Sequence, residues 1–132
     1  MKKTRIAING FGRIGRAFLK IAKYRKEIEI VAINDLGNLE NFAYLLKYDT
    51  VYGKSDFEIT AEKTASESFL IVDGKKIKYL SEKEPNNLPW KSLDIDVVVE
   101  SSGFFTSYEK SKAHLDAGTK RVVISAPVKD KA

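Results

Sequence analysis

Near its start the chain carries three glycines, Gly10, Gly12 and Gly15, with the spacing G-x-G-x-x-G. A short apolar run precedes them and an amphipathic helical pattern follows, which is the order of a phosphate-binding strand, turn and helix. We expect Gly10 to permit a tight turn, Gly12 to let the backbone approach a pyrophosphate, and Gly15 to let the helix lie close to its strand. The anion would bind at the positive end of that helix.

A carboxylate lies where such a unit needs one for a ribose. Asp35 follows a second apolar run, residues 28–33, and lies 20 residues after Gly15. An acid at the tip of the second strand accepts hydrogen bonds from the adenine ribose hydroxyls and repels a 2′-phosphate. The neighbouring Leu36 is uncharged and cannot bind a phosphate either. These residues favour NAD over NADP, although the glycines alone, or Asp35 alone, are equally typical of ordinary turns.

The composition limits the class of protein and the kind of site. The length of 132 residues suits one domain, residues 1–132. With no cysteine and one histidine, we expect no disulfide, no thiol chemistry, no metal site and no catalytic residue in this chain. No apolar run resembles a transmembrane segment or a signal peptide. The net charge of +5 is spread along the sequence, so we interpret most lysines as solvated surface.

The elements that must position these residues are those of a doubly wound, mostly parallel α/β sheet. Apolar runs predict strands at residues 4–9, 29–34, 95–100 and 121–125. Helical spacing predicts helices after the glycines, near residues 39–46 and from 106 to 117. The first helix is expected to bury Ile14, Ala17, Phe18, Ile21 and Ala22, with Arg13, Arg16 and Lys20 on the other side. Arg13 and Arg16 could be phosphate ligands, although Arg16 is at least as typical of a solvated helix charge. Between residues 56 and 79, alternation around Asp73-Gly74 predicts an inserted antiparallel hairpin.

Small polar residues follow the predicted parallel strands. They are Asn9, Asp35, the run 101–103 and Ser125. The carboxyl ends of parallel strands share one crevice of a doubly wound sheet, so these residues fit a cofactor site, although each serine singly could be a turn cap. His114, on the third helix, has no apparent partner, and we expect a structural or solvated role for it.

Four segments carry a family resemblance. They are residues 8–16 (INGFGRIGR), 32–36 (AINDL), 46–50 (LKYDT) and 124–127 (ISAP), in this order. Together they resemble the N-terminal, NAD-binding part of the glyceraldehyde-3-phosphate dehydrogenase family, over essentially the whole chain. The resemblance implies a Rossmann-type fold, NAD as cofactor, and a cytoplasmic, homotetrameric, glycolytic parent enzyme with no membrane or specific nucleic-acid partner.

The resemblance also implies individual cofactor contacts. The backbone around Arg13 and Ile14 would bind the pyrophosphate, Asp35 the adenosine ribose, and Lys83 would lie near the adenine end. Ser102 and Gly103 would lie beside the adenine and its ribose, and Ser125 toward the nicotinamide. Ser102 stands where the family more often has threonine. The expected cofactor-binding residues are Gly10, Gly12, Arg13, Ile14, Gly15, Asp35, Lys83, Ser102, Gly103 and Ser125.

The chemistry of the family needs groups that this chain lacks. A cysteine thiolate attacks the aldehyde, hydride passes to NAD, and phosphate releases the acyl group as 1,3-bisphosphoglycerate, with a histidine activating the thiol. Those residues lie beyond residue 132 in the family, so we expect a truncated cofactor-binding half, inactive alone, with an exposed sheet edge and apolar face. The alternatives are a stand-alone NAD-binding module, a weak RNA binder, or an erythrose-4-phosphate dehydrogenase domain; against the last, Asp35 replaces the glutamate those enzymes tend to carry.

Overall fold

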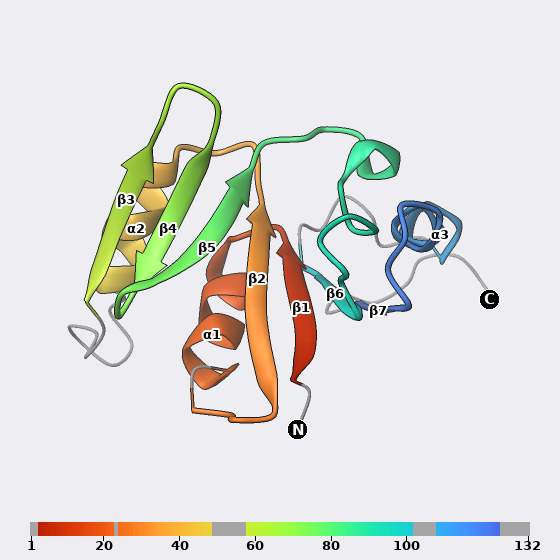
Figure 1. Cartoon of the computed structure of the whole chain (residues 1–132), viewed down its shortest axis with the longest axis horizontal. Helices are drawn as coiled ribbons and strands as arrows, with labels where there is room; N and C mark the ends of the chain where they lie inside the picture. The colour runs from red at the N-terminus through yellow and green to blue at the C-terminus, as the bar shows by residue number, and fades with distance from the viewer. Residues whose placement is uncertain (1–2, 23, 49–57, 102–107, 125–132) are drawn as a thin grey trace.

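The computed structural model describes residues 3–22, 24–48, 58–101 and 108–124, without the side chains of residues 108–111. In this part of the chain, seven strands form one sheet in the order β3-β4-β5-β2-β1-β6-β7 (Figure 1). The strands are β1 (Thr4–Asn9), β2 (Ile28–Asn34), β3 (Ile59–Lys63), β4 (Ser68–Val72), β5 (Lys75–Leu80), β6 (Val97–Glu100) and β7 (Arg121–Ile124). The helices are α1 (Arg13–Ala22), α2 (Leu39–Lys47), the 3-10 turn η1 (Pro85–Asn87) and α3 (Tyr108–Asp116).

The strand order confirms the predicted doubly wound sheet with an antiparallel insertion. Strand β1 pairs in parallel with β2 on one side and with β6 on the other, so the chain changes direction across the sheet at β1. The insertion turns at Asp73 and Gly74, both with positive φ, and its last strand, β5, pairs in parallel with β2. Ligands bind at such a switch point, beyond the carboxyl ends of the strands.

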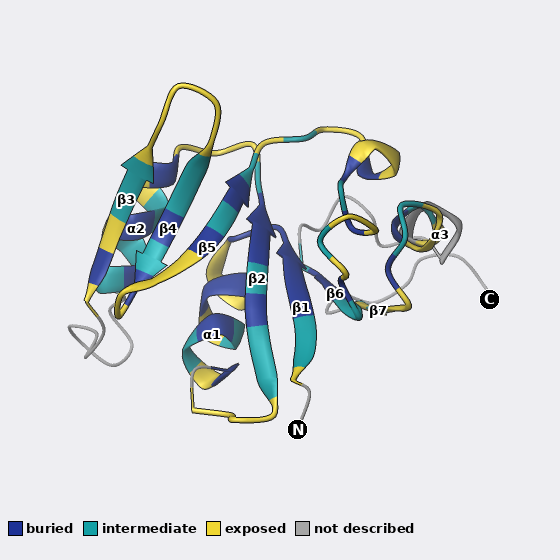
Figure 2. Ribbon diagram, in the orientation of Figure 1, coloured by how far each residue is buried: buried dark blue, intermediate teal, exposed yellow. Residues whose placement is uncertain are grey.

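Two apolar cores cover the two faces of the sheet, and the central strands are the most deeply buried (Figure 2). Ile6 and Ile8 of β1 belong to the core that α1 and α2 close, whereas Ala7 faces the core around Trp90. The alternation follows from the two-residue period of a strand, and it confirms that β1 is buried on both faces. Trp90 covers the sheet as predicted, on the face opposite to α1.

The buried face of α1 differs from the prediction. The residues that it buries are Gly15, Arg16, Leu19 and Ala22. The prediction is confirmed for Ala22, and Phe18 packs partly buried against the core. It was wrong for Ile14 and Ile21, which are 54% and 62% exposed, and for Ala17, which is also exposed. The cause is Gly15: a Cβ placed there would lie 2.3 Å from the Gly10 carbonyl oxygen, so the helix approaches β1 through this residue. That contact fixes the rotation of α1, turning Arg16 inward and Ile14 outward.

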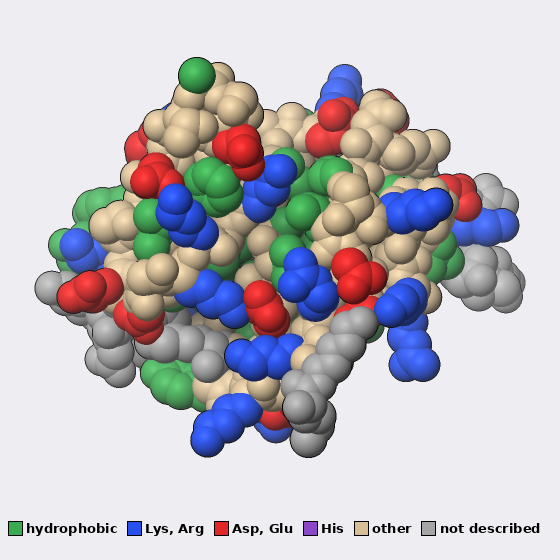
Figure 3. Space-filling model, in the orientation of Figure 1, with side chains coloured by type: hydrophobic (Ala, Val, Ile, Leu, Met, Phe, Trp, Pro, Cys, Tyr) green, Lys and Arg blue, Asp and Glu red, His purple; other side chains and the backbone are tan. Residues whose placement is uncertain are grey.

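The charged side chains are distributed as a solvated surface. Lysine, arginine and acidic side chains are interspersed over the face shown in Figure 3. Some form exposed ion pairs, such as Lys63 Nζ with Glu40 Oε1 at 2.8 Å, which contribute little to stability. Of the helices that the structure describes, none has the length and apolar character needed to cross a membrane.

Candidate cofactor-binding site

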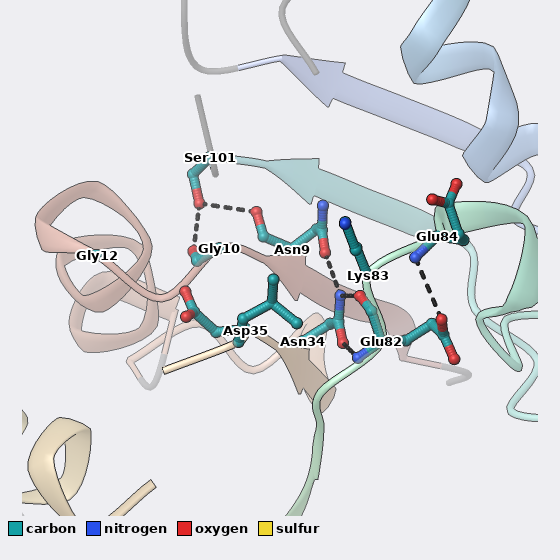
Figure 4. A pocket seen from close by; sticks show the side chains of 10 residues that line it. Asn9, Gly10, Gly12, Asn34, Asp35, Glu82, Lys83, Glu84 and Ser101 are labelled. Atoms are coloured by element: carbon teal, nitrogen blue, oxygen red, sulfur yellow. Dashed lines mark hydrogen bonds between the residues drawn. The ribbon is translucent and has the colours of Figure 1, made fainter. Parts of the chain in front are cut away.

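A cleft of about 380 Å³ opens where β1, β2 and β6 end (Figure 4). Its lining residues are Asn9, Gly10, Gly12, Asn34, Asp35, Leu36, Glu82, Lys83, Glu84 and Ser101. The prediction that polar residues at the strand ends share one crevice is confirmed for Asn9, Asp35 and Ser101. The predicted residues Ser102, Gly103 and Ser125 lie outside the described part of the chain.

The three glycines have three different surroundings. Gly10 has a φ of +96°, as the predicted tight turn requires, and its N–H donates to the Asn34 carbonyl at 2.7 Å. Gly15 makes the predicted close helix–strand contact, since a Cβ there would lie 3.2 Å from Ile8 Cγ2. A Cβ at Gly12 would meet no atom within 4 Å. Packing within the described chain therefore gives no reason for glycine at position 12, and its predicted role toward a ligand stays a prediction.

Phe11 holds the glycine turn in place. Its ring is fully buried and packs edge-on against Phe42, with the ring centroids 5.7 Å apart. Its N–H donates to Asp35 Oδ2 at 2.7 Å, and its carbonyl accepts from Arg16 Nη1 at 3.1 Å. Arg16 is only 8% exposed, so the expectation of a solvated charge was wrong, and its guanidinium supports the turn.

The N-terminus of α1 begins directly after Gly12, which lines the cleft. The first helical bond runs from the Arg16 N–H to the Gly12 carbonyl at 2.9 Å, so Gly12 caps the helix. The first turn contains no acidic side chain, and Arg13 and Ile14 are exposed there. Because the first turn of α1 carries no acidic side chain of its own, the positive end of the helix suits an external anion.

Asp35 lies in the same cleft, beside the glycine turn (Figure 4). Its Oδ2 accepts from Phe11 N and its Oδ1 from Gly37 N, both at 2.7 Å. Each carboxylate oxygen retains a further lone pair, so Asp35 can still accept from hydroxyl groups in the cleft.

The Tyr79 hydroxyl donates to the Gly37 carbonyl at 2.7 Å. Burial, and then the negative charges of Asp35 and Glu40, raise the pKa of Tyr79 above its ordinary value.

The segment 82–84 forms a further wall of the cleft and includes Lys83, whose place near an adenine stays a prediction. Asn34 holds this segment: Nδ2 donates to the Glu82 carbonyl at 3.0 Å, and Oδ1 accepts from the Glu82 N–H at 2.8 Å. Sequence reasoning did not select Asn34, Glu82 or Glu84 as site residues. The available signal was that β1 and β2 both end in asparagine.

A buried polar cluster behind the cleft was also missed. His114 is fully buried, and its Nε2 lies 2.6 Å from Glu100 Oε2. Trp90 Nε1 donates to His114 Nδ1 at 3.0 Å. The expectation of a structural histidine agrees with this burial, but the expectation that it lacks a partner was wrong. The partners lie on different elements, so no local pattern in the sequence connects them.

Comparison with known protein families identifies the family to which the chain belongs. The family described as "Glyceraldehyde 3-phosphate dehydrogenase, NAD binding domain" matches residues 4–108. The chain belongs to the glyceraldehyde-3-phosphate dehydrogenase family. This match confirms the resemblance found in the sequence and the Rossmann-type fold, and it supports NAD as the cofactor.

Relatives of the chain carry the family name. It is 53% identical over 128 residues to the glyceraldehyde-3-phosphate dehydrogenase of Thermotoga maritima, covering 96% of this chain and 37% of that protein. It is 50% identical over 130 residues to that of Mycoplasma pneumoniae, covering 98% of this chain and 37% of that protein. The cytosolic enzyme of Trypanosoma brucei brucei is 47% identical over 126 residues, 96% of this chain and 37% of that protein. The chain therefore spans little more than a third of the length of these relatives.

Proposed function

We propose that the chain is the cofactor-binding part of a phosphorylating glyceraldehyde-3-phosphate dehydrogenase. The reaction would convert glyceraldehyde 3-phosphate, NAD and phosphate to 1,3-bisphosphoglycerate and NADH. The observation that carries the proposal is the arrangement of one cleft: Gly12 leaves open space beside the acid-free start of α1, and Asp35 lies at the end of the next strand. The names of the relatives support the reaction.

The residues of the cleft fit a dinucleotide. The backbone around Arg13 and Ile14 would hold the pyrophosphate against the positive end of α1. Asp35 would accept hydrogen bonds from the adenosine ribose, and Lys83 would lie near the adenine. From the family resemblance, Ser102 and Gly103 would flank the adenosine and Ser125 would lie toward the nicotinamide.

Bound NAD would supply the hydride acceptor, and the residues of this chain would bind and orient it. The 132 residues contain no cysteine, so the thiol that the family uses must come from elsewhere in the protein. We therefore propose that residues 1–132 form the NAD-binding domain and have no dehydrogenase activity alone. A homotetrameric, cytoplasmic parent enzyme belongs to the same proposal.

The nucleotide preference follows from the charge at the end of β2. The Asp35 carboxylate would repel a 2′-phosphate, and Leu36 beside it is exposed and uncharged. Replacing Asp35 by alanine should weaken NAD binding by about 10- to 150-fold, because one hydrogen bond to a charged group contributes about 1.5–3 kcal/mol. Asp35→Asn removes the repulsion of a 2′-phosphate and should narrow the preference for NAD over NADP. Its single side-chain oxygen cannot accept from both the Phe11 and the Gly37 N–H groups, so NAD affinity should fall as well.

Isothermal titration calorimetry with NAD and NADP tests these expectations. The matched control is Asp116→Ala, which removes an exposed carboxylate at the end of α3, away from the residues that line the cleft. Its NAD affinity should equal that of the wild type. An Asp35→Ala protein that binds NAD as tightly as the control would remove Asp35 from the site.

A further inference from the structure

A line of hydrogen-bonded side chains runs through the protein behind the cleft. It consists of Trp90, His114, Glu100, Asn9 and Asn34, all of them buried. Glu100 is 2% exposed, at the end of β6, and neither the pyrophosphate site nor the ribose site described above uses it. A buried carboxylate is costly, and an apolar residue that packs well is often more stabilising, so stability alone does not explain Glu100.

The donors and acceptors along this line have one consistent direction. Trp90 Nε1 can only donate, so His114 Nδ1 accepts and the ring proton lies on Nε2. That proton faces Glu100 Oε2 at 2.6 Å. Asn9 Nδ2 donates to the same oxygen at 2.6 Å, which leaves Asn9 Oδ1 to accept from Asn34 Nδ2 at 2.7 Å. The carboxylate, which only accepts, thereby sets the orientation of both amides.

The line ends on the wall of the cleft. With its orientation set by Asn9, the Asn34 amide meets both the carbonyl and the N–H of Glu82, and the three residues are joined in Figure 4. A reversed Asn34 amide would place its NH₂ against the Glu82 N–H and its oxygen against the Glu82 carbonyl. The position of the 82–84 segment therefore depends on a correctly oriented Asn34.

We propose that Glu100 and His114 are positioning residues for the dinucleotide. Acting through Asn9 and Asn34, they hold the 82–84 wall at the distance from β2 that the adenosine end requires. Neither residue contacts the ligand. This inference rests on the proposed NAD-binding function.

Three variants test the inference by calorimetry with NAD, with thermal unfolding measured in parallel. Glu100→Leu removes both acceptor sites and should weaken NAD binding about tenfold, as a misplaced cleft wall loses one to two ligand hydrogen bonds. Glu100→Gln should stay within about threefold of wild type, because its side-chain oxygen can accept from both Asn9 and His114. The control is Thr119→Val, which removes the partly buried hydrogen bond from the Thr119 hydroxyl to the Arg121 carbonyl. This bond lies away from the cleft, so the variant should lower stability without changing NAD affinity.

The outcomes separate this inference from the proposed function. A wild-type protein that does not bind NAD would refute the function itself. Wild-type affinity in a folded Glu100→Leu protein, or equal losses in Glu100→Leu and Glu100→Gln, would overturn only the positioning role. If Glu100→Leu does not fold, Asn34→Ala provides the same test at the other end of the line, since it releases Glu82 and leaves the contact between His114 and Glu100 in place. Unchanged NAD affinity in that variant would also refute the inference.

Discussion

Alanine at Gly15 should lower the stability of the protein, whereas alanine at Gly12 should weaken NAD binding and leave stability almost unchanged. At Gly15 the new Cβ would lie 2.3 Å from the Gly10 carbonyl oxygen and 3.1 Å from Ser101 Oγ, so α1 must move away from β1. Overpacking of this kind costs about 1–3 kcal/mol, and the contact with backbone favours the upper part of that range. For a chain of 132 residues, about 2–3 kcal/mol lowers the melting temperature by roughly 7–11 °C.

At Gly12 the added Cβ meets no protein atom, and φ is not positive, so the melting temperature should be unchanged or slightly higher. The methyl group would instead occupy the space through which a phosphate reaches the turn. Loss of one charge-assisted hydrogen bond, about 1.5–3 kcal/mol, predicts NAD binding roughly 10- to 150-fold weaker. Calorimetry and thermal unfolding on both variants provide the measurement. If Gly12→Ala binds NAD like the wild type, or unfolds as early as Gly15→Ala, this reasoning is wrong.

Two further predictions concern groups outside the glycine turn. Because the pKa of Tyr79 is raised above the ordinary value of about 10, its contribution to stability is complete below pH 10 and is lost as the pH rises above it. The stability advantage of wild type over Tyr79→Phe should therefore shrink by about 1.4 kcal/mol between pH 9 and pH 11 in urea unfolding; a constant difference would contradict the shift. Ile21, exposed on α1, should tolerate lysine within about 0.5 kcal/mol, and Ile21→Lys should reduce any self-association seen by sedimentation at high concentration. We expect the wild-type protein to self-associate at high concentration through its exposed apolar side chains, and a protein that stays monomeric there would refute this expectation.

The fold could be predicted where the sequence signals are local, as they are for β1. For α1 the local signals were present, but they were interpreted incorrectly. Strand β1 was predicted with the bounds that the structure has, because an apolar run ending in glycines is a short-range pattern. The predicted face of α1 was wrong at Ile14, Ala17 and Ile21 because apolarity alone ranked Ile14 above Gly15. The sequence contained the correction: a glycine expected to touch the strand must face it, and Leu19 and Ala22 lie four and seven residues later on the same side.

The polar line behind the cleft could not be predicted from one sequence. Asn9 and Glu100 are 91 residues apart and Trp90 and His114 are 24 apart, so only the assembled sheet and α3 bring them together. The sequence shows Glu100 as the polar end of an apolar strand, which is equally typical of a solvated turn. That Glu100 is buried becomes evident only when β6 is seen to lie beside β1 in the interior of the sheet.

The glycine turn is held in shape by the folded chain itself. Phe11 is fixed by its ring against α2, by its carbonyl against Arg16 and by its N–H against Asp35. Because folding already orders this turn, a bound pyrophosphate would not have to order it, which favours tight binding. The same carboxylate that supports the turn would bind the ribose. A substitution at Asp35 would therefore affect the binding of both the pyrophosphate and the adenosine ribose. A shift in the ratio of NAD to NADP affinity, rather than a loss of NAD affinity alone, is therefore the measurement that isolates the ribose contact of Asp35.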